Sequence, residues 1–254
     1  MHNGGDGRNL DACYNVQAVV DEKNKLIVDF EVSTNPDDKG ALPQMTEQAK
    51  EIMGVSEIKV TADKGYYDGS DISDCEKKGT ACYVPAAENY VHAPDRKFDR
   101  SNFTYDKEHD HYICPESKVL PFRYLEKRAL STNQDRYKRV YHNTQACRDC
   151  PSREKCTTSK KMGRTINRLD GQDALDVVGV RMETDYGRRM LKERKKIIEH
   201  PFGTVKYIWG YRQFICRTQE KTTGEQSLAF LAYNLRRVFN IFKANGKDLM
   251  EAIA

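Results

Sequence analysis

The sequence predicts an α/β fold in which a mixed sheet with flanking helices is interrupted by a basic, cysteine-containing insertion. Alternating apolar residues near the N-terminus are typical of a β-hairpin, and short apolar runs then alternate with helical patterns up to residue 87. The periodicity fades over residues 88–168, and helical patterns return from residue 169 onwards. We therefore expect residues 1–87 to begin the core, residues 88–168 to form the insertion, and residues 169–254 to complete the core with helices.

Each element of the N-terminal part follows from a local pattern. Residues 14–21 and 25–33 alternate in polarity around the polar turn Glu22-Lys23-Asn24, which predicts a hairpin. Helical spacing of apolar residues predicts a helix over 42–53, and a second helix over 71–78 is closed by Gly79. Short apolar runs at 57–62 and 81–85 predict strands. A hairpin followed by strand–helix–strand units implies one mixed sheet.

Two long helices are predicted in the C-terminal part. The first covers residues 173–200 and is expected to end or kink just after Glu199, because Pro201 disfavours helical geometry at the residue before it. The second covers residues 226–243 and has a continuous apolar stripe, which we expect to face the core. The stripe consists of Leu228, Leu231, Leu235, Val238, Phe239 and Phe242.

Composition excludes several classes of protein. The 254 residues are 38% hydrophobic and 31% charged, and no apolar run approaches the length of a membrane span. The N-terminus has no apolar segment typical of a signal peptide, so a cytoplasmic protein with reduced cysteines is expected. Nucleotide-binding and serine-hydrolase motifs are missing from the sequence. We therefore expect neither a membrane nor a small molecule as the partner.

The net charge of +4 hides a local asymmetry. Residues 123–168 contain 13 Lys and Arg against 4 Asp and Glu, a net charge of +9 in 46 residues. A basic module on an otherwise acidic chain indicates a polyanion as partner, and DNA or RNA are the common polyanions. A solvated basic surface with no partner is the alternative.

Four of the eight cysteines are clustered in the predicted insertion. Cys147 and Cys150 form a C-x2-C pair, Cys156 follows closely, and Cys114 is available as a fourth ligand. Four thiolates in tetrahedral arrangement form a structural Zn²⁺ site, which would order an insertion with little core of its own. An iron–sulfur cluster and four reduced cysteines in a compact subdomain remain the alternatives.

Two carboxylates are candidate ligands for a catalytic metal. Asp63 directly follows a predicted strand, where binding residues of open α/β sheets are often found, and carboxylate oxygens suit Mg²⁺ or Mn²⁺. Glu199 ends a basic helix, and Lys206 lies seven residues further on as a candidate phosphate ligand. A turn aspartate and a surface ion pair are the ordinary alternatives for these two acids.

Several segments together resemble the catalytic part of a bacterial insertion-sequence transposase of the DDE class. The resemblance is to the branch whose RNase H-like domain has a cysteine-containing insertion before the final glutamate. It covers nearly the whole chain in the expected order. Besides the cysteine cluster, the matching segments are Tyr14-Asn15-Val16-Gln17-Ala18-Val19-Val20-Asp21, Ala62-Asp63-Lys64-Gly65-Tyr66, Glu199-His200-Pro201-Phe202-Gly203-Thr204-Val205-Lys206 and Ala232-Tyr233-Asn234-Leu235-Arg236-Arg237.

The resemblance implies a chemistry and a set of roles. Such enzymes hold two Mg²⁺ ions with two Asp and one Glu, and they cut transposon ends and join them to target DNA. Asp63 matches the second Asp and Glu199 the Glu, so the two carboxylates should face each other in the fold. Lys206 matches the Lys of the family's Tyr-Arg-Glu-Lys pattern. The Arg position holds Lys195 with Arg194 beside it, and the Tyr position holds Lys192, so these four residues are the candidate DNA contacts.

The first Asp of the resemblance has no clear match. The order of predicted strands fits strands two to five of an RNase H-like sheet, so the first strand and its Asp are expected upstream of Met1. Asp11 and Asp21 are the fallback candidates, and Asp38 is expected to cap the first helix. A chain without the first Asp should be inactive or severely impaired. A non-catalytic DNA-binding remnant and a metal-dependent nuclease are therefore the rival functions, and a homodimer remains open.

Overall fold

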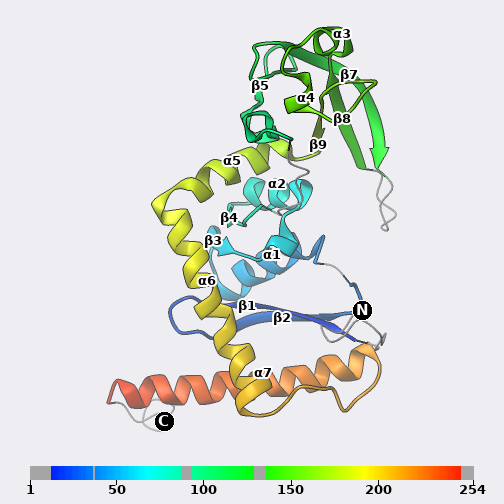
Figure 1. Cartoon of the computed structure of the whole chain (residues 1–254). Coiled ribbons are helices and arrows are strands. Elements are labelled where there is room, and N and C mark those ends of the chain that lie inside the picture. Colours follow the sequence, from blue (N-terminus) through cyan, green and yellow to red (C-terminus); the bar gives the residue numbers. More distant parts are fainter. Residues whose placement is uncertain (1–12, 37, 87–92, 129–135, 247–254) are drawn as a thin grey trace. The chain divides into compact units, whose positions relative to one another are not determined.

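The computed structural model describes residues 13–36, 38–86, 93–128 and 136–246 (Figure 1). The chain forms two compact units: unit 1 comprises residues 1–87 and 173–254, and unit 2 comprises residues 88–172. Both combine strands with helices, so the predicted mixed α/β class is confirmed. No helix in the described part is both long and apolar enough to span a membrane.

Unit 1 begins with the predicted hairpin. Strands β1 (Asn15–Val20) and β2 (Ile27–Ser33) pair antiparallel, with Asn15 opposite Ser33 and an irregularity in register between Val19 and Val20. Asp21 stabilises the turn between them, because its carboxylate accepts hydrogen bonds from the backbone N–H groups of Lys23 and Asn24. The fallback candidate Asp21 therefore lies at the hairpin turn, with its carboxylate bound to local backbone.

The second pair of strands in unit 1 is parallel. Helix α1 (Ala41–Met53) leads into β3 (Ile58–Thr61), which is followed by the 3-10 turn η1 (Lys64–Tyr66), helix α2 (Gly69–Lys77) and β4 (Thr80–Tyr83). Asp68 caps α2 by accepting hydrogen bonds from the N–H groups of Ser70 and Asp71. Ile72, Cys75 and Cys82 are fully buried in the core between these elements.

The described residues do not confirm one mixed sheet in the core. Among the described strands, β1 pairs with β2 only and β3 pairs with β4 only, so the core contains two separate two-stranded sheets. One edge of β1 and one edge of β3 therefore have no described strand beside them. A backbone strand edge without a partner is a place where a further strand can pair.

The first C-terminal helix differs from the prediction at two points. It is divided into α5 (Gln172–Glu183) and α6 (Asp185–Gly203), because the Thr184 hydroxyl accepts a hydrogen bond from the Gly187 N–H and starts a new helix. Helix α6 continues past Glu199 to Gly203 and leads into a π-helical turn, η4 (Thr204–Ile208). Pro201 lies in the last turn, where it removes a single backbone hydrogen bond, and it is buried.

Helix α7 (Gln219–Ala244) contacts the hairpin with the face opposite to the predicted one. Phe230 and Tyr233 are buried against the hairpin, and the Asn234 amide bonds both the N–H and the carbonyl of Ile27. The predicted stripe is exposed instead, at Leu228, Leu231, Leu235 and Phe239. The expectation that this stripe is core is therefore wrong, because aromatic and polar contacts to β2 decided which face is buried.

Unit 2 has a folded core that the fading periodicity did not predict. Five strands form one antiparallel sheet in sequence order, and aromatic side chains including Phe103, Tyr112 and Tyr141 are buried on it. Arg168 is also buried and donates a hydrogen bond to the Tyr112 hydroxyl. The strands are β5 (Thr104–Asp106), β6 (His111–Ile113), β7 (Val119–Arg128), β8 (Arg136–His142) and β9 (Thr165–Leu169).

Short helical segments complete unit 2. Two 3-10 turns, η2 (Arg96–Phe98) and η3 (Arg100–Asn102), precede the sheet. Two helices, α3 (Thr144–Arg148) and α4 (Arg153–Cys156), lie in the connection from β8 to β9. This connection holds three of the four clustered cysteines, and the turn from β6 to β7 holds the fourth.

Candidate functional site

Asp63 lies directly after β3, where the chain turns into η1. Its carboxylate accepts a hydrogen bond from the Lys64 N–H at 2.6 Å and caps the 3-10 turn. The side chain is 56% exposed, and one oxygen lies 3.7 Å from a guanidinium nitrogen of Arg194 on α6. An exposed carboxylate at the carboxyl end of a parallel strand is available to a ligand, and helix α6 runs beside it.

Asp38 supports the Asp63 turn rather than capping α1. The N-cap of α1 is Gly40 and has no side-chain hydrogen bond, so the predicted capping role is wrong. One oxygen of Asp38 accepts hydrogen bonds from the side-chain amides of Asn15 and Gln17, at 2.9 and 3.0 Å. The other lies 2.7 Å from where a Cβ on Gly65 would be, so only glycine fits there. Asp38 thus joins β1 to the turn that carries Asp63.

The pKa of Tyr66 reflects the negative charges around this turn. Burial raises the pKa of its hydroxyl most, and the negative charges of Asp38, Asp63 and Glu31 raise it further. Three carboxylates from three different segments therefore lie near the partly buried Tyr66 hydroxyl, which makes this end of β3 electronegative. The sequence analysis did not select Glu31, and Tyr66 entered only as part of the matching segment. A glutamate in a strand carries no local signal, since only the pairing of β2 with β1 places it here.

Replacing Asp38 with Ala should lower the free energy of unfolding by about 1–3 kcal/mol, the usual cost of leaving partly buried polar groups without a partner. The two amides of Asn15 and Gln17 would lose their shared acceptor. Urea-induced unfolding measured by circular dichroism tests this. Asp74→Ala is the control, because Asp74 is 58% exposed and only 3.5 Å from the mobile end of Lys77. Equal effects of the two substitutions would contradict the assigned role.

Glu199 is exposed on α6, on a different side of the helix from Arg194. The two residues are five positions apart, which separates them by about 7.5 Å along the axis and about 140° around it. Within the described part of the chain, the Glu199 carboxylate has no hydrogen-bond or ion-pair partner. The neighbouring His200 instead lies 2.7 Å from the Tyr233 hydroxyl. The structure thus places α6 beside Asp63 but presents Arg194, not Glu199, to it.

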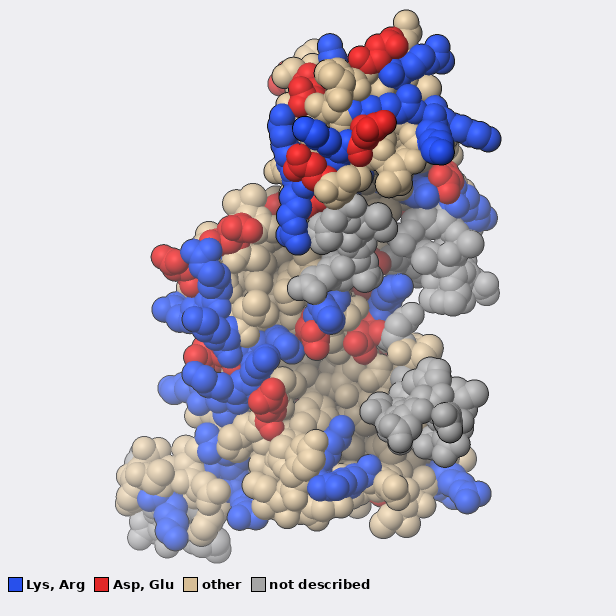
Figure 2. Space-filling model, viewed as in Figure 1, with Lys and Arg blue, Asp and Glu red and all other residues tan. Residues whose placement is uncertain are grey.

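The four candidate DNA contacts lie on α6 and η4. Lys192, Lys195 and Lys206 are exposed, and the Lys206 ammonium lies over the Phe202 ring at 5.1 Å. The Nε atom of Arg194 is buried and has no partner among the described residues. Figure 2 shows Lys and Arg side chains gathered along the course of α6. The other fallback Asp, Asp11, lies outside the described residues.

Some of the basic side chains of unit 2 make contacts inside the unit. Arg168 is buried against Tyr105 and Tyr112, and Arg139 is paired with Asp110 and the Tyr141 hydroxyl. Other basic residues of the segment are exposed, namely Arg123, Lys127, Arg148, Lys155, Lys160 and Lys161. Among the described residues of the segment, this exposed subset is the part best placed to contact a polyanion such as DNA.

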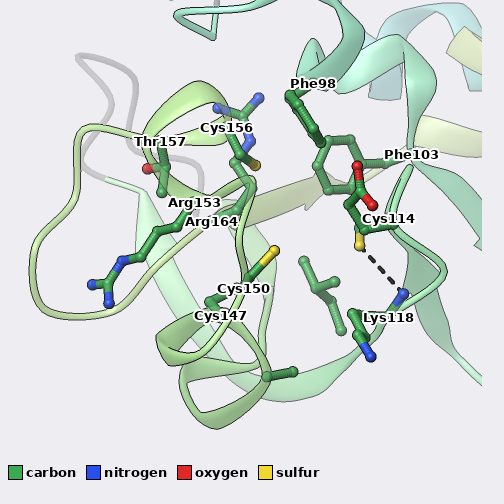
Figure 3. A pocket seen from close by; sticks show the side chains of 13 residues that line it. Phe98, Phe103, Cys114, Lys118, Cys147, Cys150, Arg153, Cys156, Thr157 and Arg164 are labelled. Atoms are coloured by element: carbon green, nitrogen blue, oxygen red, sulfur yellow. Dashed lines mark hydrogen bonds between the residues drawn. The ribbon is translucent and has the colours of Figure 1, made fainter.

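The clustered cysteines line one pocket in unit 2, which we call the cysteine pocket. Cys114, Cys147, Cys150 and Cys156 are around it, together with the aromatic rings of Phe98 and Phe103 (Figure 3). The pKa of the Cys156 thiol is raised to about 11, chiefly by burial and also by Cys147, Cys114 and Cys150, while Arg164 lowers it. The other three cysteines therefore lie close enough to Cys156 to influence it electrostatically.

No three of these sulfurs are within 4.8 Å of one another. In the described part of the chain, the one group of three metal-ligating side chains that meets this distance is Asp106, His109 and His111. This group lies in the turn from β5 to β6. Its members are already bonded, since Asp106 accepts from the His109 ring at 2.9 Å and from the N–H groups of Glu108 and His109. The sequence analysis did not select it.

Comparison with known proteins gives one family. The profile of the family described as "Transposase DDE domain" matches residues 113–239, which is half of the chain. No curated protein and no solved structure shows a significant match. The matched range contains Glu199 and the four clustered cysteines and leaves Asp63 outside. Because this match covers half of the chain, the chain belongs to the transposase DDE domain family.

Proposed function

We propose that this chain is part of an insertion-sequence transposase that cuts and joins DNA through two-metal phosphoryl transfer. The observation that carries the proposal is the electronegative end of β3, where Asp63 is exposed beside α6 with Asp38 and Glu31 close by. Membership of the transposase DDE domain family supports DNA as the partner. Transposon ends and target DNA are the proposed substrates.

The donor set suits a hard divalent cation. Asp63 and Glu199 offer exposed carboxylate oxygens, the ligands that Mg²⁺ and Mn²⁺ prefer. A pair of such ions would activate the attacking oxygen and stabilise the leaving oxygen of a phosphodiester. The guanidinium of Arg194 lies 3.7 Å from Asp63, where a cation is electrostatically favoured. With a metal ion held by Asp63, the Arg194 guanidinium would be able to bind a DNA phosphate instead.

The third carboxylate belongs to a strand that the described residues do not provide. In an RNase H-like sheet, a central strand carrying the first Asp would lie between strands equivalent to β1 and β3. The core is separated into two sheets, and the outer edges of β1 and β3 are among those without a described strand, which supports such an arrangement. A strand inserted there would pair antiparallel to β1 and parallel to β3, and would bring its Asp close to Asp63.

The Glu199 side chain must point in a different direction if it is to bind the same pair of metal ions as Asp63. Around the axis of α6, the Glu199 side chain points about 140° away from the side chain of Arg194, the residue that faces Asp63. We propose that α6 turns about its axis when the central strand and the metal ions are present. Non-catalytic DNA binding is the second candidate function, because the observed direction of Glu199 favours it over a complete active site.

A strand-transfer assay tests the proposal. The 254-residue chain and a version extended upstream to include a strand with an Asp are incubated with transposon-end DNA and target DNA in Mg²⁺ and in Mn²⁺. We expect joined products from the extended protein. Cleavage without joining would indicate a nuclease, and binding without either reaction would favour the non-catalytic function. Robust transfer by the 254-residue chain that Asp21→Asn abolishes would identify Asp21 as the first Asp.

A further inference from the structure

The cysteine pocket combines ligands from two separate segments of unit 2. Cys114 comes from the turn between β6 and β7, and the other three cysteines come from the connection that contains α3 and α4. We propose that the cysteine pocket binds one structural Zn²⁺ ion through its four thiolates. The site is independent of the proposed DNA chemistry, because it lies within unit 2 and needs neither Asp63 nor Glu199.

The Cys114 turn directs a backbone N–H group at the Cys114 sulfur. Ser117 adopts the left-handed conformation with φ 57, and the Cys114 N–H donates to the Lys118 carbonyl at 2.9 Å. The Lys118 N–H in turn donates to the Cys114 Sγ atom at 3.3 Å (Figure 3). A backbone N–H directed at sulfur stabilises the negative charge of a metal-bound thiolate and fixes its orientation.

The charges around the pocket balance those of a tetrathiolate site. Four thiolates and one Zn²⁺ ion carry a net charge of −2. Lys118, Arg153 and Arg164 line the same pocket, and Glu116 is the one acidic residue among its lining residues. The surroundings therefore contribute a net charge of +2, which offsets the charge of the metal site. Four reduced thiols would need no such compensation.

The metal would draw the two segments together. Zn–S bonds of about 2.3 Å in a tetrahedral site hold sulfur atoms about 3.8 Å apart. No three of the sulfurs are within 4.8 Å of one another, so the four sulfurs would have to come closer together on binding. Gly163 packs directly against Cys147, since a Cβ at position 163 would lie 2.4 Å from the Cys147 Cβ. A bound Zn²⁺ ion would thus link residues 143–163 to the five-stranded sheet of unit 2 through Cys114.

Elemental analysis of the purified full chain tests the proposal directly. We expect about one Zn per chain, and we expect Co²⁺ substitution to give the visible absorption of a tetrahedral tetrathiolate site. Removing the metal with a chelator should make residues 143–163 more sensitive to protease and the four thiols reactive. Iron instead of zinc, or a metal-free chain with protected residues 143–163, would overturn the proposal.

Three substitutions identify the ligands even if one of the variants unfolds locally. Cys150→Ser should lower the zinc content several-fold, whereas Cys216→Ser should leave it unchanged, because Cys216 is exposed and outside unit 2. His109→Ala distinguishes the cysteine pocket from the turn of Asp106, His109 and His111. Loss of zinc in His109→Ala with zinc retained in Cys150→Ser would move the site to that turn and contradict the proposal.

Discussion

Asp63→Asn in the upstream-extended protein is expected to lower DNA cleavage and strand transfer by about 10³-fold or more. A carboxylate that holds a catalytic metal contributes several kcal/mol of charge stabilisation in the transition state, and each factor of ten corresponds to about 1.4 kcal/mol. Asparagine keeps the size of the side chain and can still accept the 2.6 Å hydrogen bond from the Lys64 N–H. The substitution therefore removes the charge and spares the turn.

Glu199→Gln should reduce activity by a similar factor, because it removes the other carboxylate of the proposed metal site. Asp74→Asn is the matched control, since Asp74 is an exposed acid on α2. Product formation on labelled DNA gives the rates, and binding of Mn²⁺ measured by calorimetry gives a readout independent of turnover. If Asp63→Asn retained both full activity and full Mn²⁺ binding, the role of Asp63 would be refuted.

DNA affinity is the second large effect. Binding of the chain to a DNA duplex should weaken by about 10³-fold or more between 50 and 200 mM salt if six or more phosphates are contacted. The exposed Lys and Arg residues of unit 2 are numerous enough for this, even though Arg139 and Arg168 are engaged internally. Fluorescence anisotropy across a salt series gives the slope of affinity against salt concentration.

Charge reversal shows which surface carries that salt dependence. Lys160→Glu together with Lys161→Glu should weaken binding and make the salt slope shallower, because two phosphate contacts are lost. Lys77→Glu together with Asp74→Lys keeps the net charge and alters an ion pair on α2 of unit 1, so it serves as the control. Salt-independent binding, or equal binding by both variants, would exclude unit 2 as the DNA surface.

The zinc proposal can be tested independently of the two predictions above. A variant that loses zinc but keeps residues 143–163 partly ordered can still be assayed for DNA binding. Catalytic failure of Asp63→Asn says nothing about the cysteine pocket, because the two sites lie in different units. Each proposal can therefore fail without the other.

Local patterns in the sequence were sufficient for most elements of unit 1. The hairpin, α1, β3, α2 and β4 form within a few residues of their predicted bounds, because apolar periodicity and turn residues act over short distances. The position of Asp63 at the end of a strand also followed from local pattern. The sheet of unit 2 was missed because its strands alternate aromatic and charged residues irregularly, and two of them have only three residues.

By itself, the sequence determined the α/β class, the position of Asp63 after a strand and the clustering of the cysteines. Only the tertiary structure decided which face of α7 is buried, that Asp38 supports the Asp63 turn, and that α6 presents Arg194 to Asp63. These features depend on contacts between residues that are far apart in the chain. Periodicity specifies which residues share a face of a helix, but the neighbours available in space determine which face is buried.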